Sequence, residues 1–265
     1  MLGPSAASCV ERGQFSVAAW LLSTAALCEA ALGNLTASHD TLARATELAE
    51  RVGNPPVTGL FRLVVSIVHT FVRGEGYELF LPVFEQILAD NAPNLGWLTA
   101  VMSATGAACY AHAGRSKAAL QALGRALPGL EAGAGWGRDY AATMTLAIDV
   151  LWTLKRRDPA DVLERNLREK VLALDFRHVA TDARLSLARL CALTGRFDEA
   201  REWFEKARRV LDEQGARPLR AVVDFDEAWM EVRRGGAGDR SHCSTRREVP
   251  SSRSACRGVC AGRWS

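Results

Sequence analysis

Glycines recur about every forty residues in this chain, each after one helix-like apolar segment and before another. Gly33, Gly74 and Gly114 follow one another at this interval, Gly195 comes two intervals later, and Gly235 comes after one more. A period of this length is typical of proteins that stack helix hairpins side by side. We therefore interpret these glycines as hairpin turns, where a left-handed backbone conformation favours glycine.

The segments between the glycines predict paired helices, because apolar residues recur at steps of three and four and prolines or charged breaks end the runs. The fourth pair lacks a glycine: the charged break Arg156-Arg157-Asp158 lies near the middle of the long gap. There Asp158 and Pro159 predict a helix start, with the Asp side chain accepting from backbone N–H groups and Pro at the first helical position. The predicted pairs are 15–32 with 36–52, 57–73 with 77–89, 98–113 with 116–130, 140–154 with 159–174, 181–193 with 198–213, and a sixth from about Leu219 to Arg233.

Two hairpins align position by position when residues are counted from the glycine. Small residues stand five and twelve positions later, and a large apolar residue stands nine positions later, which lets two helices approach closely around one filled groove. The pattern is weak after Gly74 and absent near Asp158. The aligned residues are Ala119, Leu123 and Ala126 after Gly114, Ala200, Phe204 and Ala207 after Gly195, and Ser38, Leu42 and Ala45 after Gly33.

These hairpins resemble tetratricopeptide repeats. The fifth hairpin matches the family's spacing at Leu187, Ala188, Gly195, Ala200, Phe204 and Ala207, and the third matches at Ala107, Tyr110, Gly114, Ala119 and Ala126. The family's closing proline is missing from both, and the period is nearer forty than about thirty-four. In this longer period the hairpins are similar to the tetratricopeptide-like repeats of large bacterial ATP-binding regulators, of the LuxR type or linked to cyclases. The resemblance covers residues 15–235 and implies an all-α, tetratricopeptide-like α-solenoid.

The chain lacks the motifs with which such regulators act. No G-x-x-x-x-G-K-[ST] phosphate loop occurs, so we expect no ATP binding and no cofactor. No helix-turn-helix segment with a basic face follows the repeats. A module that binds a protein partner, other domains of a regulator or a small effector is therefore expected. The alternatives are a truncated, non-functional fragment of a larger ATPase regulator and, third, an all-α enzyme.

Charge divides the chain into two parts. The net charge is +3, but residues 236–265 hold six Arg against Asp239 and Glu248, so the helical body carries −1. We therefore expect no nucleic-acid binding by the body. The scattered cysteines show no pairing framework, which favours a reducing cytoplasm. Residues 15–32 are too short and too interrupted to span a bilayer; a buried first helix is favoured over a signal peptide.

The two ends of the chain differ from the repeats. Residues 1–14 are interpreted as a flexible N-terminus, and residues 236–265 as a disordered basic tail. Periodicity stops where the next helix is due, which raises the hypothesis of a shifted reading frame from Ser241 onward. A basic nucleic-acid arm is one alternative for the tail. A zinc set, whose spacing fits no finger, is another: His242, Cys243, Cys256 and Cys260.

No group of side chains has the spacing of a catalytic or metal site. The histidines are dispersed, and no G-x-S-x-G nucleophile elbow occurs. Asp224, Asp226 and Glu227 lie too close in sequence to share a helix face, so we interpret them as solvated. We expect no catalytic, metal-binding or cofactor-binding residues, no membrane contact, and self-association through apolar ends of the array. The dispersed histidines are His39, His69, His112 and His178.

Overall fold

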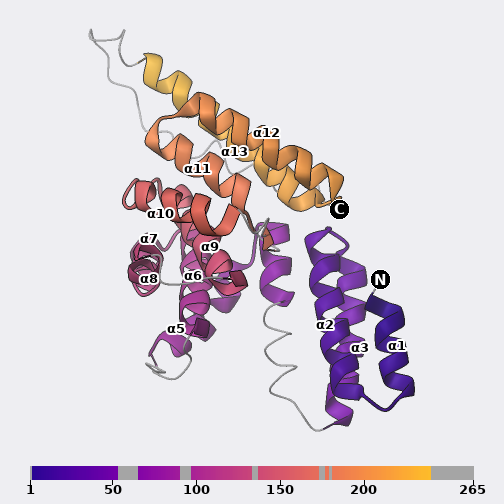
Figure 1. The fold of residues 1–265 in the computed structure, drawn as a ribbon. Coiled ribbons are helices and arrows are strands. Elements are labelled where there is room, and N and C mark those ends of the chain that lie inside the picture. The colour runs from indigo at the N-terminus through magenta and orange to yellow at the C-terminus, as the bar shows by residue number, and fades with distance from the viewer. Residues whose placement is uncertain are drawn as a thin grey trace. The chain divides into compact units, whose positions relative to one another are not determined.

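The chain folds almost entirely into helices in the part that the computed structural model describes, residues 2–52, 65–89, 97–132, 137–172, 177–178 and 181–239 (Figure 1). The prediction of an all-α fold is thus confirmed. The exception among these residues is a two-residue antiparallel pair, β1 (Arg177–His178) with β2 (Thr181–Asp182). Two compact units are distinguished, Met1–Ala228 and Trp229–Ser265, and their boundary falls inside the last helix.

The helices follow one another with short turns. Helical residues 65–73 lie between α3 and η1. The elements are α1 (Leu2–Glu11), α2 (Phe15–Ala31), α3 (Leu35–Arg51), η1 (Tyr77–Phe80), α5 (Leu81–Ala89), α6 (Trp97–His112), α7 (Ser116–Leu123), α8 (Leu127–Glu131), α9 (Gly137–Leu154), α10 (Ala160–Asn166), η2 (Leu167–Val171), α11 (Ala183–Thr194), α12 (Phe197–Glu213) and α13 (Arg217–Asp239).

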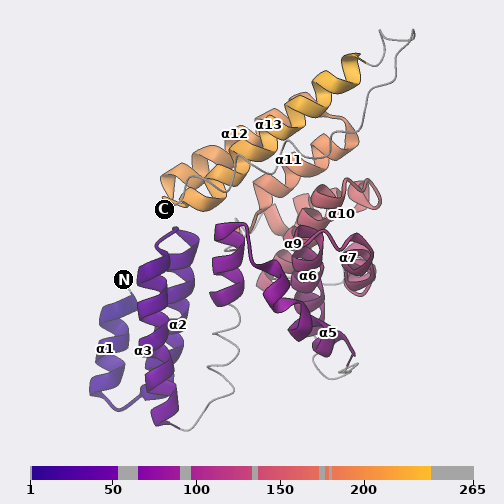
Figure 2. The same ribbon diagram turned by 180° about the vertical axis from the view of Figure 1, so that it is seen from behind.

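Sequential helices pack as hairpins: α2 on α3, α6 on α7 and α11 on α12. Figures 1 and 2 show α11 and α12 side by side from opposite directions. The first helices of successive hairpins also pack on one another, α6 on α9 and α9 on α11. This second set of contacts joins neighbouring hairpins into one body.

The turns share one hydrogen-bonding pattern. At Gly195 (φ 87°) the backbone N–H donates to the Ala192 carbonyl, and the Arg196 N–H donates to the Cys191 carbonyl. This is the Schellman arrangement, which satisfies the last carbonyls of a helix and needs a left-handed residue. The same pair of bonds closes the helices at Gly13, Gly33, Gly114 and Gly215, all with positive φ. Gly74 also has a positive φ, 71°, but its N–H donates to Thr70.

Lys155 occupies the turn position for which the sequence offers no glycine. Its φ is 58°, its N–H donates to the Trp152 carbonyl, and the Arg156 N–H donates to the Leu151 carbonyl. Lys155 lies one period after Gly114 and one period before Gly195, so the repeat is unbroken here. The predicted helix start at Asp158 is wrong. Pro159 precedes the first helical residue, and no side chain caps α10.

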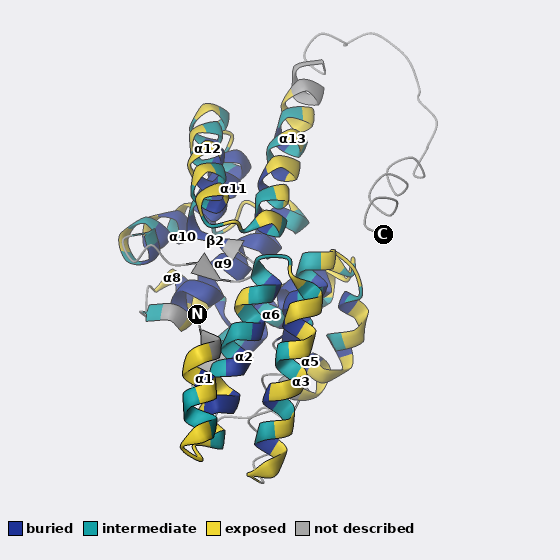
Figure 3. Ribbon diagram, turned by 90° about the vertical axis from the view of Figure 1, so that its right-hand side faces the viewer, coloured by how far each residue is buried: buried dark blue, intermediate teal, exposed yellow. Residues whose placement is uncertain are grey.

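Small residues occupy the predicted contact positions. Ala119 and Ala126 are 0% and 3% exposed, and Ala200 and Ala207 are both 0% exposed. Ser38 and Ala45 are likewise buried in the first hairpin. Counting from Lys155 instead of a glycine gives Ala160, 2% exposed, at the same position as Ala119 and Ala200. Figure 3 shows that buried residues dominate α9 and α11, whereas α12 and α13 are buried along one side.

Several predicted boundaries are wrong. The N-terminus forms α1 instead of a flexible segment, and Ala6 of this helix is buried against Leu22 and Ala45. The predicted helix 116–130 is interrupted at residues 124–126, and 159–174 changes from α10 to a π-helical turn, η2. Helix α13 continues through Gly235 to Asp239, beyond its predicted end at Arg233.

Other predictions fall outside the described residues. The predictions for the tail from residue 240 onward, which are the shifted reading frame, the nucleic-acid arm and the zinc set, lie outside the described residues. The first residues of the predicted helix 57–73 also lie outside them. Within the described residues, no helix combines the length and the apolar character that crossing a bilayer requires.

Candidate functional site

Four ionisable side chains are bonded in series across four helices, α6, α9, α11 and α13. They are His112 on α6, Asp149 on α9, Arg189 on α11 and Asp226 on α13. In the sequence, each follows the one before by about the forty-residue interval of the turns. Their signs alternate when His112 is protonated. We call this set the ionic ladder. Each of the four helices contributes one residue to the ladder.

Each rung is bonded to the next. His112 Nε2 lies 2.8 Å from Asp149 Oδ2, Arg189 Nη1 donates to Asp149 Oδ1 at 2.8 Å, and Arg189 Nε donates to Asp226 Oδ2 at 2.7 Å. The Trp152 indole N–H also donates to Asp226 Oδ1, at 2.9 Å. The side chains of Asp149, Arg189 and Asp226 are each 5% exposed. Both carboxylates are therefore satisfied on both oxygens in a nearly dry environment.

The ladder shifts the titration of its members. Burial alone would raise the pKa of Asp149, but the charges of His112 and Arg189 and their hydrogen bonds lower it to about 2. Burial favours the neutral imidazole of His112, but the charge and hydrogen bond of Asp149 raise its pKa above 6.5. Burial also disfavours the charged Arg189, yet Asp226 and Asp149 raise its pKa. The fold thus favours the charged forms of all three groups.

This arrangement was not predicted from the sequence. The interpretation of Asp224, Asp226 and Glu227 as one solvated group is wrong, because Asp226 is 3% exposed and shares the buried face of α13 with Val223. A signal was present: Asp149 and Arg189 each interrupt an otherwise apolar helical run. A charge in a buried helix requires a partner of opposite sign, so a pair between these helices could have been predicted.

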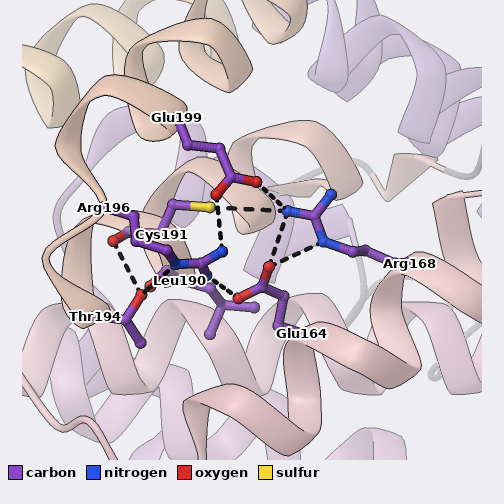
Figure 4. Close-up of polar contacts among 7 residues, drawn as sticks. All are labelled: Glu164, Arg168, Leu190, Cys191, Thr194, Arg196 and Glu199. Atoms are coloured by element: carbon purple, nitrogen blue, oxygen red, sulfur yellow. Dashed lines mark hydrogen bonds and ion pairs between the residues drawn. The ribbon is translucent and has the colours of Figure 1, made fainter.

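A second group of polar side chains lies where α10, η2, α11 and α12 meet, and Figure 4 shows its contacts. Arg168 donates from Nε to Glu164 Oε1 at 2.9 Å and also pairs with Glu199. Arg196 pairs with both Glu164 and Glu199. Glu164 stands nine positions after Lys155, where the other hairpins place Leu123 and Phe204. A carboxylate at this position requires the two guanidinium groups as partners.

Cys191 lies beneath this cluster and completes a set of three potential metal ligands. Single ligand atoms of Glu164, Cys191 and Glu199 lie within 4.8 Å of one another. However, burial and then the nearby Glu164 raise the pKa of the Cys191 thiol to about 12. The thiolate is the form that binds metals and attacks substrates, and a divalent cation would have to displace Arg168 and Arg196. The geometry therefore favours an ion-pair cluster.

Trp203 on α12 extends the cluster toward solvent. The Arg168 guanidinium lies 5.3 Å from the Trp203 ring centroid, and Lys206 Nζ lies 4.2 Å from it. The Arg196 and Glu199 side chains are 40% and 36% exposed. Tryptophan and arginine are the residues that most often dominate binding energy at protein interfaces. We name the group Arg168, Arg196, Glu199, Trp203 and Lys206 the α12 surface.

The predicted hairpin residues bring no ionisable side chain into either group. Gly33, Gly74, Gly114 and Gly195 lie at helix ends, and the hydrogen bonds that join the ionic ladder do not involve them. Phe204 is 0% exposed between the alanines of α12. These residues shape the hairpins and bring no reactive group into either site.

Comparisons with known proteins give no family for this chain. No protein-family model matches it, and neither a curated protein nor a solved structure matches it.

Proposed function

We propose that this chain is a tetratricopeptide-like helical-repeat module that binds a protein segment, either on a separate partner or on another domain of a bacterial regulator. The observation that supports it best is the repeated turn: Gly114, Lys155 and Gly195 follow one another at the same interval and close their helices with the same two backbone hydrogen bonds. Repeat arrays of this kind expose long surfaces that suit peptide and protein binding.

The α12 surface is the part of the module that we propose for the contact. It combines an aromatic ring with cations and a carboxylate, and its polar side chains are partly exposed. A partner segment with an apolar side chain beside an acidic one would pack on Trp203 while pairing with Lys206 or Arg196. The exposure of these residues favours an extended protein segment over a small enclosed effector.

Site-specific photocrosslinking in the host cell tests the proposal. A photoreactive phenylalanine analogue replaces Lys206 on the α12 surface or, as control, the exposed Lys117 of α7. We expect a discrete crosslinked protein from position 206 that is absent from position 117. Mass spectrometry then identifies this protein and the crosslinked segment.

A second experiment uses calorimetry to measure how tightly the identified segment binds to the protein and its variants. Trp203→Ala should weaken binding by roughly tenfold or more, as expected for an interface aromatic. Glu202→Ala, an exposed neighbour on the same helix, should change it less than about threefold. Equal crosslinking at both positions, or an unchanged affinity of Trp203→Ala, would remove the α12 surface from the proposal. Absence of any crosslinked protein would count against a binding module.

A further inference from the structure

His112 is the rung of the ladder that solvent reaches. It is the last residue of α6, and its side chain is 28% exposed, whereas that of its partner Asp149 is 5% exposed. Its ring stacks on Tyr77 of η1, with centroids 4.8 Å apart and planes inclined by 16°. Phe71 of the helical segment 65–73 meets the same ring edge-on, with centroids 5.7 Å apart. One imidazole thus joins α6 and α9 to the segment that carries η1.

Protonation strengthens three interactions of this ring. An imidazolium attracts the Asp149 carboxylate, and it attracts the π face of Tyr77 as other cations do. The carboxyl end of α6 adds a further favourable interaction, because a helix C-terminus carries partial negative charge. Deprotonation weakens all three contacts together while leaving the apolar contact with Phe71 intact.

The surrounding charges favour the same response. The groups acting on His112 are Asp149 from α9, Arg189 from α11 and Asp226 from α13. With His112 protonated, the two carboxylates face two cations; without that proton, one negative charge in a nearly dry site loses its partner. Two other titratable groups nearby remain neutral. Burial raises the pKa of the Cys109 thiol to about 12 and raises the pKa of Tyr77 beyond its usual value.

We propose that His112 is a proton-controlled latch that holds η1 (Tyr77–Phe80) against the end of α6 while its imidazole is protonated and releases it when the imidazole loses its proton. The release is local. Helices α9 and α11 keep their apolar contacts and the Arg189 ion pairs, whereas η1 meets the ladder through the stack of Tyr77 on His112. The latch does not depend on the proposed partner.

Hydrogen exchange of the full chain between pH 6.5 and 9 tests this proposal, with rates corrected for the intrinsic effect of pH. Protection of the amides of residues 77–80 should fall by roughly three- to tenfold as His112 loses its proton, the range expected for a cation–π contact. Amides in α9 should keep their protection. NMR of the His112 ring should show that the fall follows the imidazole titration.

Variants separate the latch from ordinary stabilisation. His112→Gln retains a hydrogen-bond donor for Asp149 but no titrating charge, so the pH dependence at residues 77–80 should vanish. His39→Gln, an exposed residue of α3, should leave it unchanged. Should His112→Gln fail to fold, Tyr77→Leu supplies the test: the pKa of His112 should fall while protection loses its pH dependence. A pH response that persists in His112→Gln or Tyr77→Leu, or that is equal in α9, would overturn the latch.

Discussion

Lys155 holds a backbone conformation that glycine would hold without steric cost. A left-handed conformation costs an L-residue roughly 1–2 kcal/mol because Cβ approaches a carbonyl oxygen. The turn nevertheless forms, since its two backbone hydrogen bonds and the packing of α9 and α10 outweigh this cost. One strained residue therefore keeps the fourth hairpin in step with its neighbours.

Replacing Lys155 with glycine should stabilise the protein. We expect Lys155→Gly to raise the free energy of unfolding by about 0.5–1 kcal/mol, the relief of strain less the extra flexibility of glycine in the unfolded chain. Gly195→Ala is the matched control. An added Cβ there meets nothing within 4 Å, so its expected loss of about 1 kcal/mol reports the backbone alone. Urea unfolding followed by circular dichroism measures both, and a loss of stability in Lys155→Gly would contradict the strain argument.

Ser186 offers a second test of a single residue. It is 0% exposed on α11, and its Oγ has no hydrogen-bond partner among the described residues. Ser186→Ala should raise the free energy of unfolding by about 1 kcal/mol, because an unpaired buried hydroxyl is removed. In Ser23→Ala the lost hydroxyl donates to the Ala19 carbonyl at 2.8 Å, so this control should gain less or lose stability. Equal changes in the two variants' thermal or urea midpoints would show that Ser186 has a partner after all.

At the scale of helices, apolar contacts and ions have different roles. Alanines at matched positions let the helices of one hairpin approach closely, and the ionic ladder links one hairpin to the next. A buried ion pair adds little stability compared with well-packed apolar groups, but removing one partner is costly because the other charge remains. Arg189 is the most sensitive rung, since it serves two carboxylates.

Arg189→Met should therefore lower the free energy of unfolding by about 3–5 kcal/mol. Adding Asp226→Asn should restore part of this loss, because an uncompensated charge becomes an amide that still accepts from Trp152. Arg209→Met on the exposed side of α12 should change stability by less than about 0.5 kcal/mol. Denaturant titration of the four proteins gives the comparison. A double variant less stable than Arg189→Met alone would show that Arg189 does not compensate the charge of the Asp226 carboxylate.

The sequence allowed the helices to be predicted wherever the signal was local. Gly33, Gly114 and Gly195 mark turns because few other residues adopt their backbone conformation, and apolar spacing marks the helices between them. The turn at Lys155 could not be predicted, because lysine rarely adopts positive φ and tertiary packing imposes it. The ladder and the α12 surface depend on contacts between different helices of the array, which apolar periodicity within one helix does not reveal.

For the whole molecule, the ladder connects stability to pH. Asp149 has a folded pKa of about 2, below its ordinary value of 3.8, so its contribution is present above pH 3.8 and is lost as the pH falls toward 2. His112 has a raised folded pKa, so its contribution is complete below pH 6.5 and is lost as the pH rises through the folded value. Both contributions coincide between about pH 4 and 6.5.

Stability should accordingly be greatest in that interval. Between pH 5 and pH 2 we expect the Asp149 rung to lose about 2 kcal/mol of stabilisation, measured by urea unfolding at each pH. In Asp149→Asn the acid limb should be shallower by that amount, although the variant is less stable throughout. Asp40→Asn, an exposed residue of α3, should retain the original profile. An acid limb of the same slope in Asp149→Asn would assign the acid sensitivity to other carboxylates.

The alternating signs of the ladder also limit how the number of hairpins can change. Removing the hairpin that carries Asp149 would place His112 beside Arg189, and removing the one that carries Arg189 would place two aspartates together. Both leave like charges adjacent in a dry environment, which is strongly unfavourable. Removing two consecutive hairpins preserves the alternation. The alternation therefore favours an even change in the number of hairpins: hairpins can be gained or lost here in pairs, but inserting or deleting a single hairpin requires a compensating change of charge.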